Sequence, residues 1–90
     1  MTTGSLPQQL SLRVEEIIRK HVESDKPLDL ATSLQNDLDI DSLELVELSV
    51  KMEKTFGISI PFADLRPCDT VGEVIQVVER IMSKRLVEGV

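Results

Sequence analysis

The chain is poor in the side chains that enzymes and metal proteins most often use for chemistry. Its 90 residues include one cysteine, one histidine and two aromatic residues, with no tryptophan or tyrosine. A single cysteine excludes an internal disulfide, and Cys68 with His21 is too small a set for a Cys/His zinc site. Because neither residue has a partner that would activate it as a nucleophile, we expect no catalytic residue and no metal site.

Positive charge and long apolar runs are also scarce. Ten Lys and Arg residues against sixteen Asp and Glu residues give a net charge of −6, which repels phosphate backbones and anionic lipid headgroups. No stretch approaches the roughly 18 apolar residues of a membrane-spanning helix, and residues 1–5 do not resemble the start of a signal peptide. We therefore expect no nucleic acid and no membrane as partner, a cytoplasmic localisation, and basic protein surfaces as partners.

Few aromatic residues in a composition that is 41% hydrophobic predict a core of Leu, Ile, Val and Met side chains. We predict an all-α domain over residues 6–86, a small bundle of three main helices plus one short helical turn. Residues 1–5 and 87–90 are expected to be flexible ends. A domain this small buries little more than about 60% of its unfolded surface, so we expect no large enclosed active site.

Hydrophobic spacing predicts the first helix and the segment after it. Apolar residues recur at helical spacing over about residues 7–23, and Pro27 then breaks the pattern. A long structured loop follows, to about Asp41, with a short helical turn near Ser33. Five apolar residues predict that this loop packs back on the helices: Leu28, Leu30, Leu34, Leu38 and Ile40.

Capping and turn residues predict the remaining elements. These are a helix from Asp41 or Ser42 to about Phe56, an extended connector over 58–61, a single helical turn over 62–65, and a last helix that opens at Thr70. Asp41 and Glu44 form a pair like a capping box, and Thr70 with Glu73 forms a proper one. Gly57 readily takes the left-handed conformation in which many helices end.

Alternating acids at Asp37, Asp39 and Asp41 resemble the start of an EF-hand calcium loop. The rest of that pattern is missing. With Asp37 as position one, the glycine of position six is replaced by Ser42 and the glutamate of position twelve by Leu48. Without the tight turn and the last ligand, the segment does not predict a specific calcium site.

Ser42 is the candidate functional residue. At the start of a helix, a phosphate attached to its hydroxyl would lie near unpaired backbone amides and the positive end of the helix dipole. A serine that follows an aspartate at a helix start can equally be a cap that stabilises the helix. Taken alone, the residue leaves both interpretations open.

The sequence around Ser42 resembles the acyl carrier protein family. The resemblance is carried by DLDIDSLE at 37–44, VEL at 46–48, FGISIP at 56–61 and TVGE at 70–73, and it covers about residues 12–82. It implies a carrier and not an enzyme, and because no flanking domain is present in the sequence, we expect the carrier to be free-standing. It also implies that a phosphopantetheinyl transferase uses coenzyme A to attach phosphopantetheine to Ser42 through a phosphodiester.

The implied carrier would hold acyl intermediates as thioesters on this arm and deliver them to enzymes of fatty-acid, polyketide or related lipid biosynthesis. Its partners would be acyl-transferring and acyl-processing enzymes with basic docking patches. The implied partner-binding residues are Asp41, Leu43, Glu44, Val46, Glu47 and Val50. We expect Leu43 and Val46 to be partly exposed, Val50 to be mostly buried, and the protein to be a monomer.

Departures from the family pattern predict a specialised member. Where the family usually has glycine, two residues before the aspartate of Asp-Ser-Leu, this chain has Asp39, which tolerates a positive φ better than most residues. Lys51, Lys54, Phe62 and Arg66 stand where housekeeping carriers continue with acids. We therefore expect a restricted set of partner enzymes.

Two other functions remain open at this point. A peptidyl, aminoacyl or D-alanyl carrier protein would share the modified serine, although Glu44, Glu47 and the FGISIP segment favour the acyl type. Outside the carrier class, the chain could be a helical protein-interaction module that is never modified and in which Ser42 only caps a helix.

Overall fold

The computed structural model describes residues 6–25 and 27–88. It confirms the predicted all-α class, and its elements are α1 (Leu6–His21), α2 (Ser42–Phe56), α3 (Phe62–Leu65) and α4 (Val71–Glu88). Within the described residues no strand forms, and one isolated β-bridge joins Ser33 to Thr70. Of the expected flexible ends, residues 1–5 and 89–90 lie outside the described residues, and 87–88 are the last residues of α4.

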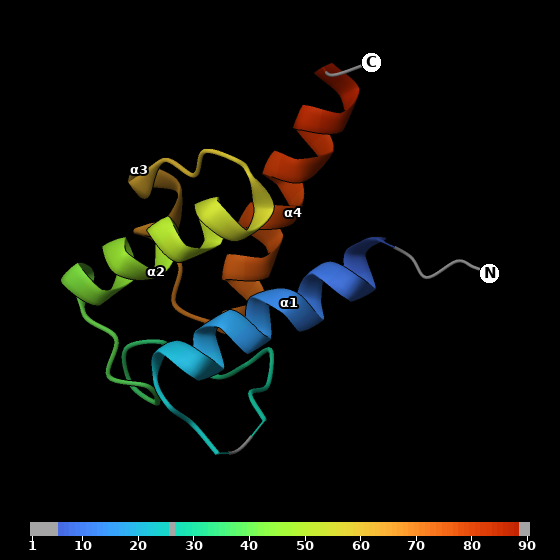
Figure 1. Cartoon of the computed structure of the whole chain (residues 1–90). Coiled ribbons are helices and arrows are strands. Elements are labelled where there is room, and N and C mark those ends of the chain that lie inside the picture. The colour runs from blue at the N-terminus through green and yellow to red at the C-terminus, as the bar shows by residue number, and fades with distance from the viewer. Residues whose placement is uncertain (1–5, 26, 89–90) are drawn as a thin grey trace.

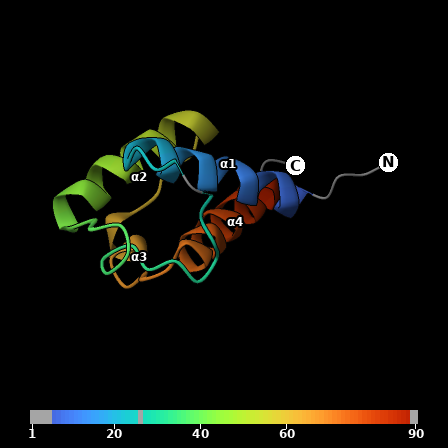
Figure 2. The same ribbon diagram turned by 90° about the horizontal axis from the view of Figure 1, so that it is seen from below.

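The helices form a bundle around α1 and α4. Helix α1 packs against both α2 and α4, while the short α3 contacts α2 and α4. Figure 2 shows α1 and α2 side by side on one side of α4. Helix α2 begins on the side of the molecule opposite the start of α1 and the end of α4 (Figure 1). The start of α2 is therefore far from both ends of the described chain.

Aliphatic side chains from all four helices fill the core, as the composition predicts. The largest fully buried residues are Val14 and Ile18 of α1, Leu48 and Met52 of α2, Leu65 of α3, and Val71, Val74 and Val78 of α4. The two aromatic residues, Phe56 and Phe62, are only partly buried at the edge of this core. The centre of the bundle is thus free of aromatic rings.

The long loop between α1 and α2 packs back on the bundle, with one exception. Leu34 and Ile40 are buried, and Leu28 and Leu38 are half-buried, but Leu30 is 62% exposed, so the expectation was wrong for that side chain. The backbone of Leu30 makes the contact instead, because its carbonyl accepts the Gly72 amide at 2.9 Å. A Cβ at Gly72 would lie 3.0 Å from this oxygen, so a side chain at this position would require the Leu30 backbone to shift by a few tenths of an ångström.

Ser33 ties the same loop to the segment before α4. The Asp37 amide donates to the Ser33 carbonyl at 3.0 Å, which forms the turn expected near Ser33. The Ser33 hydroxyl donates to Oδ1 of Asp69 at 3.0 Å, and the Leu34 amide donates to the Asp69 carbonyl at 2.6 Å. These bonds fix the loop that leads into α2.

The segment after α2 is an extended connector, as predicted. Gly57 ends α2 in the left-handed conformation, with φ 66° and its amide bonded to the Glu53 carbonyl at 2.8 Å. Ile58 and Ile60 are buried, and the Ile60 amide donates to Oε2 of Glu53 at 2.7 Å. The connector therefore pairs this amide with a side chain, where a strand would use a neighbouring strand.

Candidate functional site

Ser42 is the first residue of α2, and Asp41 is its N-cap. Oδ1 of Asp41 accepts the Glu44 amide at 2.9 Å, which confirms the predicted pairing of these two residues at the helix start. Ser42 is exposed, and its hydroxyl forms no hydrogen bond within residues 6–25 and 27–88. The interpretation of Ser42 as the cap is therefore wrong, and its oxygen is available for chemistry.

Backbone amides beside Ser42 are also available. Asp41 takes up the Glu44 amide with its side chain and the Leu45 amide with its carbonyl, at 2.9 Å each. The amides of Ser42 and Leu43 have no acceptor in the described part of the chain. A phosphate on the Ser42 hydroxyl would lie close to these donors and to the positive end of the helix dipole.

A turn at Asp39 brings the chain to this point. Asp39 has φ 56°, a left-handed conformation, as expected for a residue that stands where the family usually has glycine. The Ile40 amide then donates to the Leu34 carbonyl at 2.8 Å, and the Ile40 side chain is buried. Ile40 is thus held in the core, while Asp41 and Ser42, which follow it, are exposed.

A small pocket of about 100 Å³ opens beside Ser42, between the start of α2, α3 and the two loops. Its lining residues are Leu34, Gln35, Ile40, Asp41, Ser42, Leu45, Phe62, Arg66, Cys68 and Asp69. Polar and charged side chains share its wall with apolar ones, and Arg66 is the only cationic residue of the set. The pocket is smaller than the roughly 300 to 1,000 Å³ of a typical ligand site, so it holds only a few methylene groups as it stands.

Five of the six residues expected to bind partners lie on α2, and the sixth, Asp41, is its N-cap. We call this set of six the outer face of α2: Asp41, Leu43, Glu44, Val46, Glu47 and Val50. Leu43 is 69% exposed and Val46 is 40% exposed, which confirms the expectation for both. The expectation that Val50 is mostly buried was wrong, because Val50 is 41% exposed. Val50 follows Leu43 by two helical turns and so points outward with it.

Cys68 and His21 are the one cysteine and the one histidine of the chain, and both are half-buried. Cys68 is half-buried, and its Sγ donates to the Asp64 carbonyl at 3.6 Å. Burial, with a further contribution from the charge of Glu73, raises the pKa of the Cys68 thiol, which keeps it in the unreactive protonated form. His21 is half-buried, with Nδ1 2.9 Å from Nζ of Lys51.

Two features of other protein classes are not found in the part of the chain that the structure describes. No group of three or more His, Cys, Asp or Glu residues is placed to hold a metal ion. None of its helices has the length and apolar character needed to cross a membrane.

The hydrogen bonds made by Ser33 and Glu53 were not predicted from the sequence. Ser33 gave only a weak signal, a serine four residues before Asp37, whose Oδ2 accepts the Ser33 amide at 2.7 Å. No sequence signal marks Glu53, because nothing in the sequence distinguishes it from the other acids of α2. Its bond to the Ile60 amide depends on how the chain reverses after Gly57.

A small helical bundle with an exposed serine at the start of its second main helix is the arrangement expected of a carrier domain. Residues 12–78 match the family described as phosphopantetheine attachment site. Over 72 residues the chain is 33% identical to an acyl carrier protein of Amoebophilus asiaticus, which covers 80% of this chain and 90% of that protein. The chain therefore belongs to the acyl carrier protein family, and the predicted membership is confirmed.

Relatives from mycobacteria show the same likeness. A meromycolate extension acyl carrier protein of Mycolicibacterium aurum is 43% identical over 49 residues, which cover 54% of this chain and 50% of that protein. The chain thus spans about half the length of this relative. A solved structure described as an acyl carrier protein (Rv0033) from Mycobacterium tuberculosis superposes with a TM-score of 0.74 and 30% identity. The superposition covers 79% of this chain and 96% of the other.

Proposed function

We propose that this protein holds acyl intermediates as thioesters on a phosphopantetheine arm attached to Ser42. The observation that carries the proposal is the exposed Ser42 hydroxyl, which is freed by the Asp41 cap within a chain of the acyl carrier protein family. A carrier needs such a free hydroxyl on a rigid element, because the arm must be attached from outside and then reach into other proteins.

Attachment by a phosphopantetheinyl transferase is a phosphoryl transfer from coenzyme A. The Ser42 oxygen forms a bond to the phosphorus that bears the pantetheine group, and its proton passes to a base of the transferase. The pyrophosphate bridge of coenzyme A breaks at this phosphorus, and adenosine bisphosphate leaves with the bridging oxygen. The free amides of Ser42 and Leu43 lie where they would stabilise the new phosphodiester. The partner enzymes would supply the catalytic groups for this step and for later acyl transfers.

The outer face of α2 would guide the modified protein to its partners. Asp41, Glu44 and Glu47 attract basic patches on acyl-transferring and acyl-processing enzymes, which raises the rate of encounter. Leu43 and Val46 offer exposed apolar contact beside these acids. Contacts of this kind favour rapid binding and release. Rapid exchange between partners suits a carrier that is a monomer in the cytoplasm.

The pathway would be fatty-acid, polyketide or related lipid biosynthesis, with this chain as a specialised member. Lys51, Lys54 and Arg66 are all exposed and interrupt the acidic surface. An enzyme adapted to a wholly acidic carrier would be repelled at these positions. This surface therefore supports a restricted set of partners.

Identifying the group attached to Ser42 in the cell tests the proposal. The protein is isolated from the cells that make it, and its intact mass is measured before and after treatment with neutral hydroxylamine, which cleaves thioesters. We expect a phosphopantetheine arm that bears an acyl group, with only the acyl group released. An amino acid on the arm would indicate a peptidyl, aminoacyl or D-alanyl carrier, and an unmodified chain would indicate an interaction module.

A further inference from the structure

The charge of the side chains that project from α2 changes sign along the helix. Asp41, Glu44 and Glu47 lie in the first half, and the exposed bases Lys51 and Lys54 lie in the second. Lys54 follows Glu47 by seven residues and Lys51 follows it by four, so all three project from one side of the helix. The two bases therefore continue the outer face and do not belong to a separate surface.

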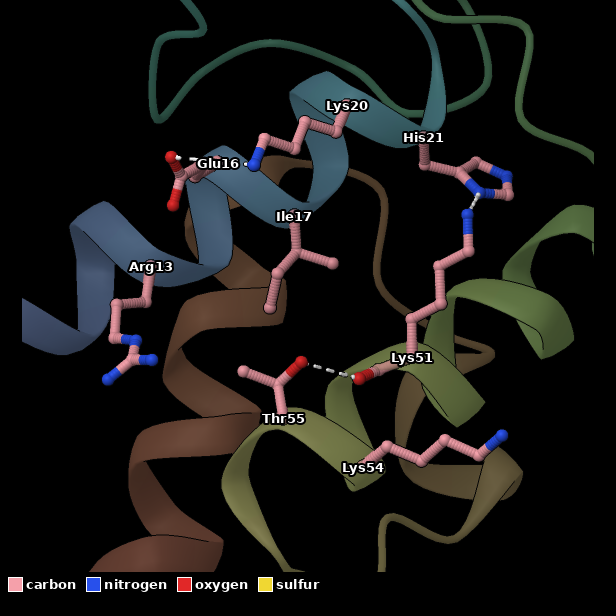
Figure 3. Close-up of a pocket in the computed structure, with 8 residues that line it drawn as sticks. All are labelled: Arg13, Glu16, Ile17, Lys20, His21, Lys51, Lys54 and Thr55. Carbon is pink, nitrogen blue, oxygen red and sulfur yellow. Dashed lines mark hydrogen bonds and ion pairs between the residues drawn. The ribbon is translucent and has the colours of Figure 1, made fainter.

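A cavity of about 540 Å³ lies beside the basic half, between α1 and α2. It is lined by Arg13, Glu16, Ile17, Lys20, His21, Lys51, Lys54 and Thr55. Figure 3 shows Ile17 projecting between the two helices, with cationic side chains around it from both helices. Four cations and one acid give this surface a local excess of positive charge in a protein whose net charge is −6. We call these eight residues the basic groove.

Most cations of the basic groove have no acid to pair with. Lys20 lies 3.9 Å from Glu16, and this is the one ion pair among the described residues. Nζ of Lys51 lies 2.9 Å from Nδ1 of His21, although Glu47 stands one turn earlier on the same helix. Arg13 and Lys54 therefore face solvent without a carboxylate, and an acidic partner surface would supply the missing counter-charges.

We infer that the acyl-processing partners of this carrier present a docking surface with a basic part and an acidic part. Cationic residues of the partner face the acidic half of α2, and carboxylates face Lys51, Lys54 and Arg13. The inference rests on the proposed function, because the partner must bind where its active site can take up the arm on Ser42. It adds to that function the chemistry by which the partner recognises this carrier.

The dimensions of the helix allow one partner to cover both halves. Twelve residues separate Ser42 from Lys54, which is about 18 Å along the axis at 1.5 Å per residue. A standard interface buries about 800 Å² on each protein, enough to span this distance. Figure 3 shows the cationic groups spread around Ile17 and pointing in different directions, which suits carboxylates on a protein surface better than one small anion.

The test measures binding of the unmodified chain to a ketosynthase that is chosen because its docking patch contains only basic residues. The double variant Lys51→Glu, Lys54→Glu removes the repulsion, so we expect its Kd to fall about tenfold at low salt. The matched control Arg80→Glu, Lys84→Glu changes the net charge equally on the exposed side of α4, and its Kd should change less than about twofold. Equal effects of the two double variants, or no binding by any variant, would overturn the inference.

Substitutions in the ketosynthase test whether carboxylates on a partner favour binding to Lys51 and Lys54. Each basic residue of the ketosynthase patch is replaced singly by Glu, and at least one replacement should tighten binding of the wild-type carrier and weaken binding of the double variant. If no replacement behaves in this way, the partner chemistry is wrong. Lys54→Glu alone, at a residue with no ion pair among those described, gives the same direction of change without disturbing the contact between Lys51 and His21.

Neither measurement needs the arm. A failure of Ser42 modification would therefore contradict the proposed function and leave the binding results to decide the inference. Thermal unfolding of each variant, followed by circular dichroism, confirms that the variants being compared are folded.

Discussion

At the scale of single residues, the site depends on a division of roles between two neighbours. Asp41 accepts the Glu44 amide and so caps α2, while Ser42 stays outside this hydrogen bonding. Had Ser42 been the cap, its oxygen would have been engaged in accepting an amide, and its modification would have cost helix stability. Because the cap lies one residue earlier, the hydroxyl can be modified without destabilising the helix start.

Asp39 gives a prediction at the same scale. Its φ of 56° costs an L residue about 1 kcal/mol, although aspartate tolerates the conformation better than most residues. Asp39→Gly should therefore leave the free energy of unfolding equal or raise it by up to about 1 kcal/mol, since the greater chain entropy of glycine offsets part of the gain. Asp39→Val should lower it by about 1 to 2 kcal/mol. Urea denaturation measures both, and a valine variant as stable as wild type would show that the strain is absent.

At the scale of elements, caps hold the loops in place around the helix starts. At the start of α4, the Glu73 amide donates to the Thr70 hydroxyl at 3.2 Å, and Oε1 of Glu73 accepts the amides of Thr70 at 3.1 Å and Asp69 at 2.6 Å. This is the predicted capping box with one additional bond. It also holds Asp69, which binds Ser33 of the loop that leads to α2.

The capping box predicts a pH dependence. The two backbone amides hold the pKa of Glu73 below its usual value, because they bind the ionised carboxylate in the folded state. The stabilisation is therefore present above the unfolded pKa, about 4.3, and is lost as the pH falls through the folded pKa. Glu73→Gln should be less stable than wild type at neutral pH, and the difference should shrink on acidification. Unfolding midpoints across this range test it, and a difference that does not vary with pH would contradict it.

Local signals in the sequence were enough to predict the main helices. Helical spacing of apolar residues, the Thr70 and Glu73 box and Gly57 placed the element ends to within one or two residues. Contacts between distant segments could not be predicted in this way. The bonds of Ser33 to Asp69 and of Glu53 to Ile60 arise only when the chain folds back on itself.

The site was predicted to a similar extent. Ser42 and its acidic neighbours were found because the motif around them is contiguous in sequence. The basic groove was not found, because it joins Arg13 and Lys20 of α1 to Lys51 and Lys54 of α2. Val50 was assigned to the interior because hydrophobicity alone does not distinguish a core side chain from an exposed apolar one.

At the scale of the whole molecule, the core and the outer face of α2 use the same kinds of side chain for different purposes. Leu48 is fully buried against the aliphatic core, whereas Leu43 is 69% exposed on the same helix. Leu48→Ala should lower the free energy of unfolding by about 2 to 5 kcal/mol, because it leaves a cavity. Leu43→Ala should change it by less than about 0.5 kcal/mol. Chemical denaturation compares the two, and a large loss of stability in the Leu43 variant would show that this residue serves the fold.

The function proposed for the whole molecule depends on a phosphopantetheine arm at Ser42. The most direct measurement is the intact mass of the protein after incubation with coenzyme A and a broad-specificity phosphopantetheinyl transferase, with Ser42→Ala and Ser59→Ala alongside. Ser59 is an exposed serine of the connector after α2, so its variant controls for loss of a hydroxyl elsewhere. We expect a gain of one phosphopantetheinyl group in wild type and in Ser59→Ala, with none in Ser42→Ala. Modification of the Ser42→Ala protein, or an unchanged mass of the folded wild-type chain, would contradict it.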